Sequence, residues 1–338
     1  MGLRGGDELD GRTYFHGYFG SGLPRAAFRT GVMVDVTVTA PPARHDQVRT
    51  PRPLARSWLA KYREGLIIRL LLWMLLIYFL APIIWAISSS LKTRAELFQA
   101  TPSFITFNPT LANYEYAIKR LTGFGLFFRN SLIVTLGATI LQTILATLAG
   151  YGFARLRFKG RDLIFYTMIM LIFVPRAGGL MAQYELMSLL GLRNSIFGLI
   201  LAFSAGLAVP TFIMRQAFLN LPPDYEDAAL IDGCNRFQAF WYVMAPMATG
   251  SMMVVALFEF IRVWGEYLFT LTMIDQRELF TLGIGMAMQF LGVSMEFGEF
   301  TSYGSQSAAF VMAASPVAIF FLATQRWFVR GLMEGLKF

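Results

Sequence analysis

Residues 221–246 read LPPDYEDAALIDGCNRFQAFWYVMAP, a polar, helix-capable segment between two long apolar ones. Pro222, Pro223 and Asp224 predict a helix start, because proline suits the first turn and an acidic side chain favours the positive end of the helix dipole. Gly233 predicts a bend, and aromatic residues at helical spacing follow it. We therefore expect helix, bend and helix to form a compact surface knob (residues 221–246) at a membrane, suited to a groove on a partner.

The composition on either side of this knob is that of a membrane protein. Of 338 residues, 56% are hydrophobic and 15% charged, whereas charged residues make up roughly a quarter of a soluble domain. The net charge of +8 does not indicate nucleic acid, because the basic residues cluster beside apolar runs instead of forming a solvated stripe. One Cys and two His exclude a disulfide framework and a His/Cys metal site. The sequence predicts an all-α membrane protein.

Six apolar segments are long enough to cross about 30 Å of hydrocarbon. They are residues 66–88, 130–153, 163–187, 195–214, 243–273 and 308–325. With this assignment, 20 of the 29 Lys and Arg residues lie on the side of both termini and about 8 on the other. Because cytoplasmic loops carry the basic excess, we expect six spans with both termini in the cytoplasm.

The first 60 residues are rich in Gly, Pro and Arg and show no sustained apolar period. This composition predicts a disordered cytoplasmic tail at 1–60, ahead of a transmembrane domain at 61–338. An alternative is that translation starts at Met33. No secretory signal is expected, because the basic stretch is too long and lacks a cleavage site after a short apolar core.

Two sequence motifs resemble known transport proteins. Asp-Ala-Ala at 227–229, followed by Gly233 and Pro246, resembles the EAA loop of ABC importer permeases, with Cys234 where alanine is usual and Ala245 where leucine is usual. Aspartate also stands where the family usually has glutamate. Residues 130–161 are similar to the second span and following turn of sugar-type permeases.

Shorter matches extend the resemblance over roughly residues 65–338, and it is closest to the maltose-transporter-type six-span permease. They include Ser90-Leu91-Lys92, the segment 331–335, and Trp264-Gly265-Glu266-Tyr267, in which Gly265 replaces the usual asparagine. The resemblance implies a permease subunit of a binding-protein-dependent ABC importer that moves sugars or oligosaccharides across the cytoplasmic (inner) membrane.

The resemblance also implies partners: a second permease subunit, a cytoplasmic ATPase dimer, an extracytoplasmic solute-binding protein and membrane lipid. ATP and Mg would bind to the ATPases, and this chain would bind no cofactor, since it has no G-x-x-x-x-G-K-[ST] motif. The chain is therefore not expected to be an enzyme. The residues expected to couple it to the ATPase are Asp227, Ala228, Ala229, Asp232, Gly233 and Arg236. A local ion pair between Asp232 and Arg236 is an alternative role for these two.

Charges in the fifth segment are candidates for a solute path. Glu259, Arg262 and Glu266 are three and four residues apart, hence on one face of a helix, and Trp264 lies among them. Charges at membrane depth usually face a cavity or a partner, so these residues are expected to form a polar wall of the path. The alternative is a salt-bridge set that stabilises the helix bundle.

Other features leave further alternatives open. Pro175, Gly178 and Gly179 interrupt the third segment, either as part of the path or as a packing kink. One alternative is an ABC permease for a non-sugar solute such as a polyol phosphate or a polyamine. An ion-coupled secondary carrier that uses the charges of 259–266 would be expected to show inverted repeats, and none is seen in the sequence.

Overall fold

The computed structural model describes residues 58–99, 101, 103–120, 123–174, 176–290 and 303–335. Within these ranges all regular structure is helical, which confirms the all-α prediction. The chain divides into two compact units, 1–63 and 64–338, and the description below concerns the second. The expected tail at 1–60, with Met33, lies almost wholly outside the described residues, and so does Pro175.

Three helices of the described residues are each long and apolar enough to cross a membrane. They are α1 (Trp58–Leu91), α4 (Phe124–Arg155) and α15 (Tyr303–Gly335), and they contain the expected spans at 66–88, 130–153 and 308–325. No part of the apolar window of α1 is buried against the rest of the chain. A helix that is apolar on all sides needs lipid or a partner helix around it.

The expected span at 195–214 is a bent pair. α7 (Ile196–Ser204) and α8 (Ala208–Asn220) meet at 53°. A second bend of 73° separates the segment Arg236–Met247 from α12 (Thr249–Trp264). If each bent pair counts as one span, the described residues hold up to five spans.

The expected third span, 163–187, is interrupted. It comprises α5 (Arg161–Met170), η1 (Leu171–Phe173), η2 (Arg176–Gly179) and α6 (Leu180–Leu189). The two glycines lie at the end of η2, where the chain turns into α6. None of these helices is long enough to span by itself, so the count of six spans stays a prediction.

The expected fifth span, 243–273, contains α12 but is not one helix. α12 ends at Trp264 with Gly265 as its C-cap, and α13 (Leu268–Met273) follows separately. Residues 265–267 therefore form a connection, so Glu266 lies beyond the helix that carries Glu259 and Arg262. The remaining helices are α2 (Arg94–Leu97), α3 (Ala112–Arg120), α9 (Asp224–Ile231), α10 (Arg236–Ala239), η3 (Phe240–Met244), α11 (Ala245–Met247), η4 (Arg277–Leu279) and α14 (Leu282–Phe290).

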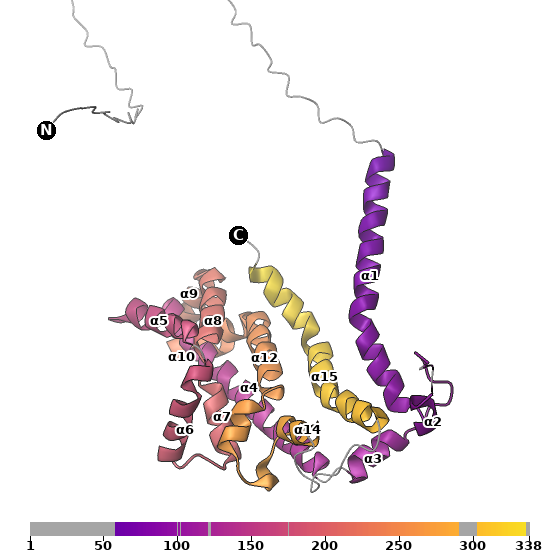
Figure 1. Ribbon diagram of the computed structural model, residues 1–338. Coiled ribbons are helices and arrows are strands. Elements are labelled where there is room, and N and C mark those ends of the chain that lie inside the picture. Colours follow the sequence, from indigo (N-terminus) through magenta and orange to yellow (C-terminus); the bar gives the residue numbers. More distant parts are fainter. Residues whose placement is uncertain are drawn as a thin grey trace, which may run out of the picture. The chain divides into compact units, whose positions relative to one another are not determined.

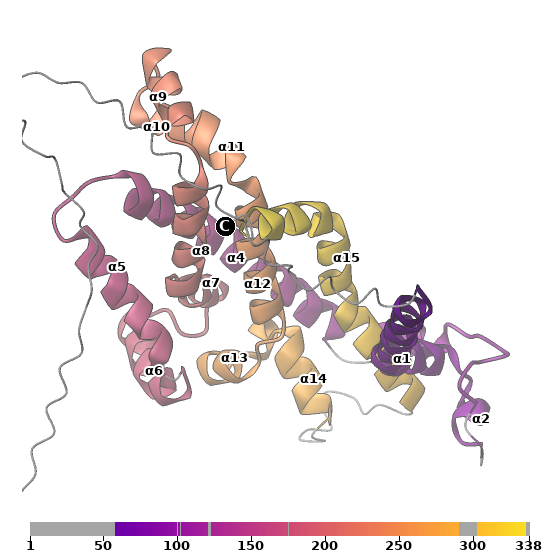
Figure 2. The same cartoon turned by 90° about the horizontal axis from the view of Figure 1, so that it is seen from above.

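α4 is the helix around which the others pack. It contacts α7, α8 and α12, and α15 covers α12 from the other side (Figure 1). A Cβ built on Gly150 of α4 would lie 2.5 Å from the Cβ of Met214 in α8, so a glycine is required for this close approach. Figure 2 shows α9 and α10 projecting past the end of α8.

Candidate functional site

The surface knob folds as a helix, a bend and a helix. α9 begins at Asp224 with Pro223 as its N-cap, as predicted. Gly233 has φ of +89° and open space where a Cβ would be, so the bend depends on a backbone conformation that favours glycine. The Asn235 side chain then caps α10 in a reciprocal capping box with Gln238.

The residues expected to couple to an ATPase are divided by burial. Ala229 is buried, whereas the other five are exposed: Asp227, Ala228, Asp232, Gly233 and Arg236. No ion pair joins Asp232 to Arg236, two described residues, so the alternative role is not seen. Two apolar side chains beside them are exposed, Ile231 by 86% and Phe237 by 69%. The knob thus presents a mixed acidic and apolar face.

Three residues at the base of the knob were not among the site residues predicted from the sequence. Tyr151 Oη donates to Glu226 Oε1 at 2.7 Å, and Arg155 Nε lies 3.7 Å from Glu226 Oε2. The only sequence signal is that Glu226 and Ala229 are three residues apart and share a helix face. Nothing local identifies the partners on α4, since Tyr151 and Glu226 are 75 residues apart.

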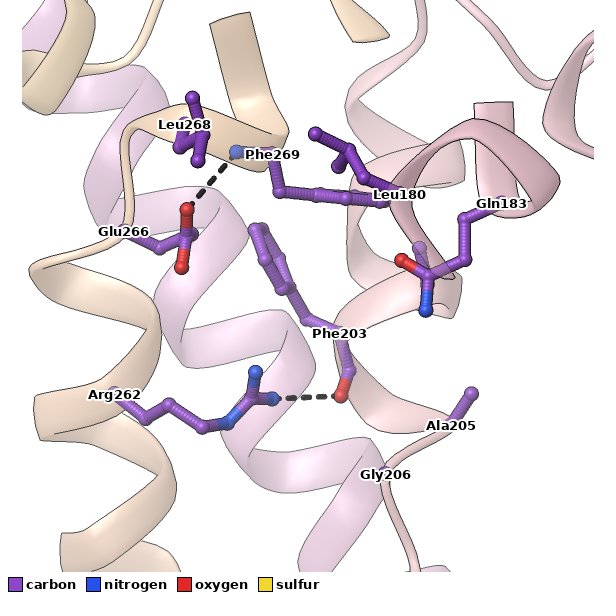
Figure 3. A pocket seen from close by; sticks show the side chains of 10 residues that line it. Leu180, Gln183, Phe203, Ala205, Gly206, Arg262, Glu266, Leu268 and Phe269 are labelled. Atoms are coloured by element: carbon purple, nitrogen blue, oxygen red, sulfur yellow. Dashed lines mark hydrogen bonds between the residues drawn. The ribbon is translucent and has the colours of Figure 1, made fainter. Parts of the chain in front are cut away.

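A pocket of about 300 Å³ lies where α6, the end of α7, α12 and α13 meet (Figure 3). Its polar side chains are Gln183, Arg262 and Glu266, and the rings of Phe203 and Phe269 form aromatic walls. Two of the expected path residues, Arg262 and Glu266, thus line one pocket. The structure adds Gln183 and the two phenylalanines to them.

Arg262 is held by the chain itself. Its Nε donates to Glu259 Oε2 at 2.7 Å, and its Nη2 donates to Glu259 Oε1 and to the backbone oxygen of Phe203, the latter at 2.8 Å. The Glu259 side chain is 3% exposed, so the carboxylate is paired and buried. The ion pair foreseen as an alternative is therefore present, while Arg262 also lines the pocket.

The expectation that three charges share one helix face is wrong for Glu266. Its Oε1 accepts a hydrogen bond from the backbone N–H of Phe269 at 2.9 Å, in the first turn of α13. Trp264 does not line the pocket. Its indole Nε1 donates to the backbone oxygen of Ala313 at 2.8 Å, which joins α12 to α15. Glu266 does not share the face of Glu259 and Arg262 because α12 ends before it, at Gly265, where the chain turns away from the helix.

A second cavity, of about 710 Å³, shares Ala205, Gly206 and Arg262 with the lining of the pocket. Gln142 of α4 lines it and donates from Nε2 to the backbone oxygen of Gly206 at 3.1 Å. The Gln142 Oε1 is buried and has no hydrogen-bond partner in the part of the chain that the structure describes. In the first pocket, hydrogen-bond donors and acceptors lie beside the rings of Phe203 and Phe269, and this combination suits an uncharged, hydroxyl-rich molecule. The described residues contain no group of three or more His, Cys, Asp or Glu that could hold a metal ion.

Comparisons with known proteins show which family the chain resembles. Residues 69–334 match the family model described as binding-protein-dependent transport system inner membrane component. The sulfoquinovosyl glycerol transport system permease protein SmoH of Agrobacterium fabrum is 35% identical, over 77% of this chain and 90% of the relative. The maltose/maltodextrin transport system permease protein MalG of Vibrio vulnificus is 30% identical, over 78% of this chain and 92% of the relative.

Similarity to a solved structure supports the fold. A chain in the crystal structure of a bacterial ABC transporter involved in the import of the acidic polysaccharide alginate superposes with a TM-score of 0.70. It is 22% identical, and the superposition covers 82% of this chain and all of that one. The family match spans both the surface knob and the pocket. This chain belongs to the family of binding-protein-dependent transport inner membrane components, the membrane permease subunits of ABC transporters.

Proposed function

We propose that the chain is the permease subunit of an ABC importer for sugars or oligosaccharides. The match over residues 69–334 carries this proposal, together with curated relatives whose names specify sulfoquinovosyl glycerol, arabinooligosaccharide, diacetylchitobiose or maltose transport. Its partners would be a second permease subunit, two cytoplasmic ATPase subunits that bind ATP and Mg, and an extracytoplasmic solute-binding protein. Both termini would be cytoplasmic, on the side with the basic excess.

The surface knob would dock into a groove on an ATPase subunit. The exposed side chains of Asp227, Asp232 and Arg236 make no hydrogen bond to the described residues. The apolar side chain of Ile231 is exposed, and burying it against a partner would be favourable because it would be removed from water. When ATP binding closes the ATPases, the knob would carry the motion into the membrane helices. By reciprocity, a loaded solute-binding protein would favour closure of the ATPases.

The pocket beside Arg262 would form part of the solute path. The guanidinium of Arg262, the amide of Gln183 and the carboxylate of Glu266 offer donors and acceptors to hydroxyl groups. Phe203 and Phe269 offer flat apolar surfaces to the faces of sugar rings. Replacing Gln183 by Ala should therefore raise the KM for transport several-fold and leave ATP hydrolysis without solute unchanged.

ATP hydrolysis in lipid nanodiscs tests the coupling part of this proposal. The chain is co-expressed with its candidate partner permease and ATPase, beside a Gly233→Asp variant. Hydrolysis that responds to the solute-binding protein in wild type and is uncoupled in the variant would support the proposal. If no ATPase co-purifies, or if the variant responds as wild type does, the proposed docking of the surface knob into an ATPase subunit fails.

The solute class needs a separate test. The melting temperature of the solute-binding protein is measured with a panel of mono- and oligosaccharides, because a bound ligand raises it by mass action. A polyol phosphate and a polyamine serve as non-sugar controls. If they raise the melting temperature and no sugar does, the carbohydrate assignment is wrong, while the importer assignment remains.

A further inference from the structure

The base of the surface knob is joined to the membrane helices by one buried carboxylate. Of the eight residues of α9, only Glu226 and Ala229 are buried. The side chain of Ala229 is a methyl group without polar atoms, so the polar link is made by Glu226. Its Oε1 accepts a hydrogen bond of 2.7 Å from Tyr151 Oη, near the end of α4.

Arg155, the last residue of α4, extends this link to α8. Its Nη2 donates to the backbone oxygens of Phe218 at 2.8 Å and Leu221 at 2.6 Å, while its Nε lies 3.7 Å from Glu226 Oε2. The last carbonyls of a helix have no intrahelical partner, and a cation there also interacts favourably with the helix dipole. One guanidinium thus joins the end of α4, the end of α8 and the start of α9.

The surroundings make this junction stiff. The ring of Tyr151 lies 5.6 Å from that of Phe218 and 4.8 Å from that of Phe240, and both partners are buried. The residue before Tyr151, Gly150, brings α4 against Met214 with no room for a Cβ. Polar contacts in such a close-packed and largely buried setting hold their geometry, because little water competes for them.

We propose that Tyr151, Arg155 and Glu226 form a coupling anchor, which makes α9 move as one body with the adjoining ends of α4 and α8. The same two helices lead to the solute pocket, since Gln142 of α4 donates to the backbone oxygen of Gly206, which lies two residues before the start of α8 and lines the pocket. The three residues are positioning residues that touch neither ATP nor solute. This inference rests on the proposed importer function.

A graded set of variants tests the anchor in the assembled complex. Tyr151→Phe removes one hydroxyl and keeps the aromatic packing, Glu226→Gln keeps an acceptor and removes the charge, and Glu226→Ala removes both. Tyr166→Phe and Glu185→Gln change an exposed tyrosine and an exposed glutamate elsewhere and serve as matched controls. If Glu226→Ala fails to assemble, Tyr151→Phe still decides the matter, because it leaves no cavity and no unpaired charge.

Two quantities are measured in proteoliposomes and nanodiscs: solute transported per ATP hydrolysed, and amide hydrogen exchange over residues 224–232. Loss of one buried hydrogen bond, about 1 kcal/mol, corresponds to about a five-fold change in an equilibrium constant. We expect Tyr151→Phe to raise exchange in α9 by about five-fold and to lower the transport ratio by a similar factor, with unchanged complex yield. Glu226→Ala should have the largest effect, and neither control should change either quantity.

The outcomes separate this inference from the proposed function. If wild type couples transport to hydrolysis and Tyr151→Phe and Glu226→Gln couple as well, the anchor proposal is overturned. Faster exchange in α9 without loss of coupling also overturns it, because the link would then be merely structural. If wild-type hydrolysis never responds to the solute-binding protein, the importer function itself fails and the coupling role fails with it.

Discussion

The guanidinium of Arg262 in α12 donates a hydrogen bond of 2.8 Å to the backbone oxygen of Phe203, near the end of α7. Phe203 lies where α7 stops and the chain bends by 53° toward α8. A carbonyl at a helix end has no partner within the helix, and lipid cannot supply one. Arg262 therefore stabilises the broken segment while Glu259 neutralises its charge, and the same guanidinium borders two cavities.

Arg262→Met should destabilise the protein strongly. The change leaves the carboxylate of Glu259 buried without a counter-charge and the Phe203 oxygen without its donor. Removing one partner of a buried pair costs about 3–5 kcal/mol. Arg193→Met is the control, because its partner Asp275 is well exposed and such a pair is worth less than about 1 kcal/mol. Thermal unfolding in detergent measures both, and equal shifts would contradict the prediction.

Two glycines of one helix should respond to alanine in opposite directions. At Gly150 a Cβ would lie 2.8 Å from the backbone nitrogen of Arg215 as well as 2.5 Å from the Met214 Cβ, so α4 and α8 must separate. Such overpacking costs about 1–3 kcal/mol. At Gly152 nothing lies within 4 Å, and alanine favours the helix by up to about 1 kcal/mol. Melting temperatures of the two variants should lie on either side of wild type.

Substitutions at Gly233 should follow backbone preference and not side-chain size. Open space surrounds Gly233, so an added Cβ would clash with nothing. The backbone φ of +89° would nevertheless be strained for any residue that has a Cβ. Asparagine tolerates this region better than alanine, and a β-branched residue tolerates it least. Stimulation of ATP hydrolysis by the solute-binding protein should fall in the order Gly, Asn, Ala, Val. Equal loss in all three variants would show that the site requires the absence of a side chain and does not follow backbone preference, and no loss in any variant would show that the bend is not required.

The segment between α1 and α3 should loosen in acid. Thr106 Oγ1 donates to Glu96 Oε2 at 2.8 Å, and this hydrogen bond lowers the pKa of the Glu96 carboxyl below its ordinary value of 4.5. Because the folded pKa is the lower one, the stabilisation is complete above about pH 4.5 and is lost as the pH falls through the folded pKa.

Proteolysis or hydrogen exchange over residues 94–107 measures this loosening as the pH is lowered. Thr106→Val removes the hydroxyl donor at nearly constant shape, so it should weaken the pH dependence of the segment. A segment that responds to acid identically in wild type and variant would show that Glu96 is not the group responsible.

Short-range signals in the sequence predicted much of the fold. Apolar length predicted α1, α4 and α15, and prolines, an acidic first turn and Gly233 predicted the shape of the surface knob. These features depend on residues a few positions apart, whose propensities and caps act locally. The family motifs are local in the same way, which is why resemblance and propensity indicated the same segment at 221–246.

The candidate sites depend on contacts between distant residues. Phe203 and Arg262 are 59 residues apart, and Tyr151 and Glu226 are 75 apart, so no periodicity relates them. Glu266 is only four residues from Arg262, yet the helix ends between them and places it on the turn into α13. Local chemistry sets where a helix begins and bends. Tertiary packing decides which buried charge meets which carbonyl, because most buried polar groups are hydrogen-bonded and their partners lie wherever the packed helices place them.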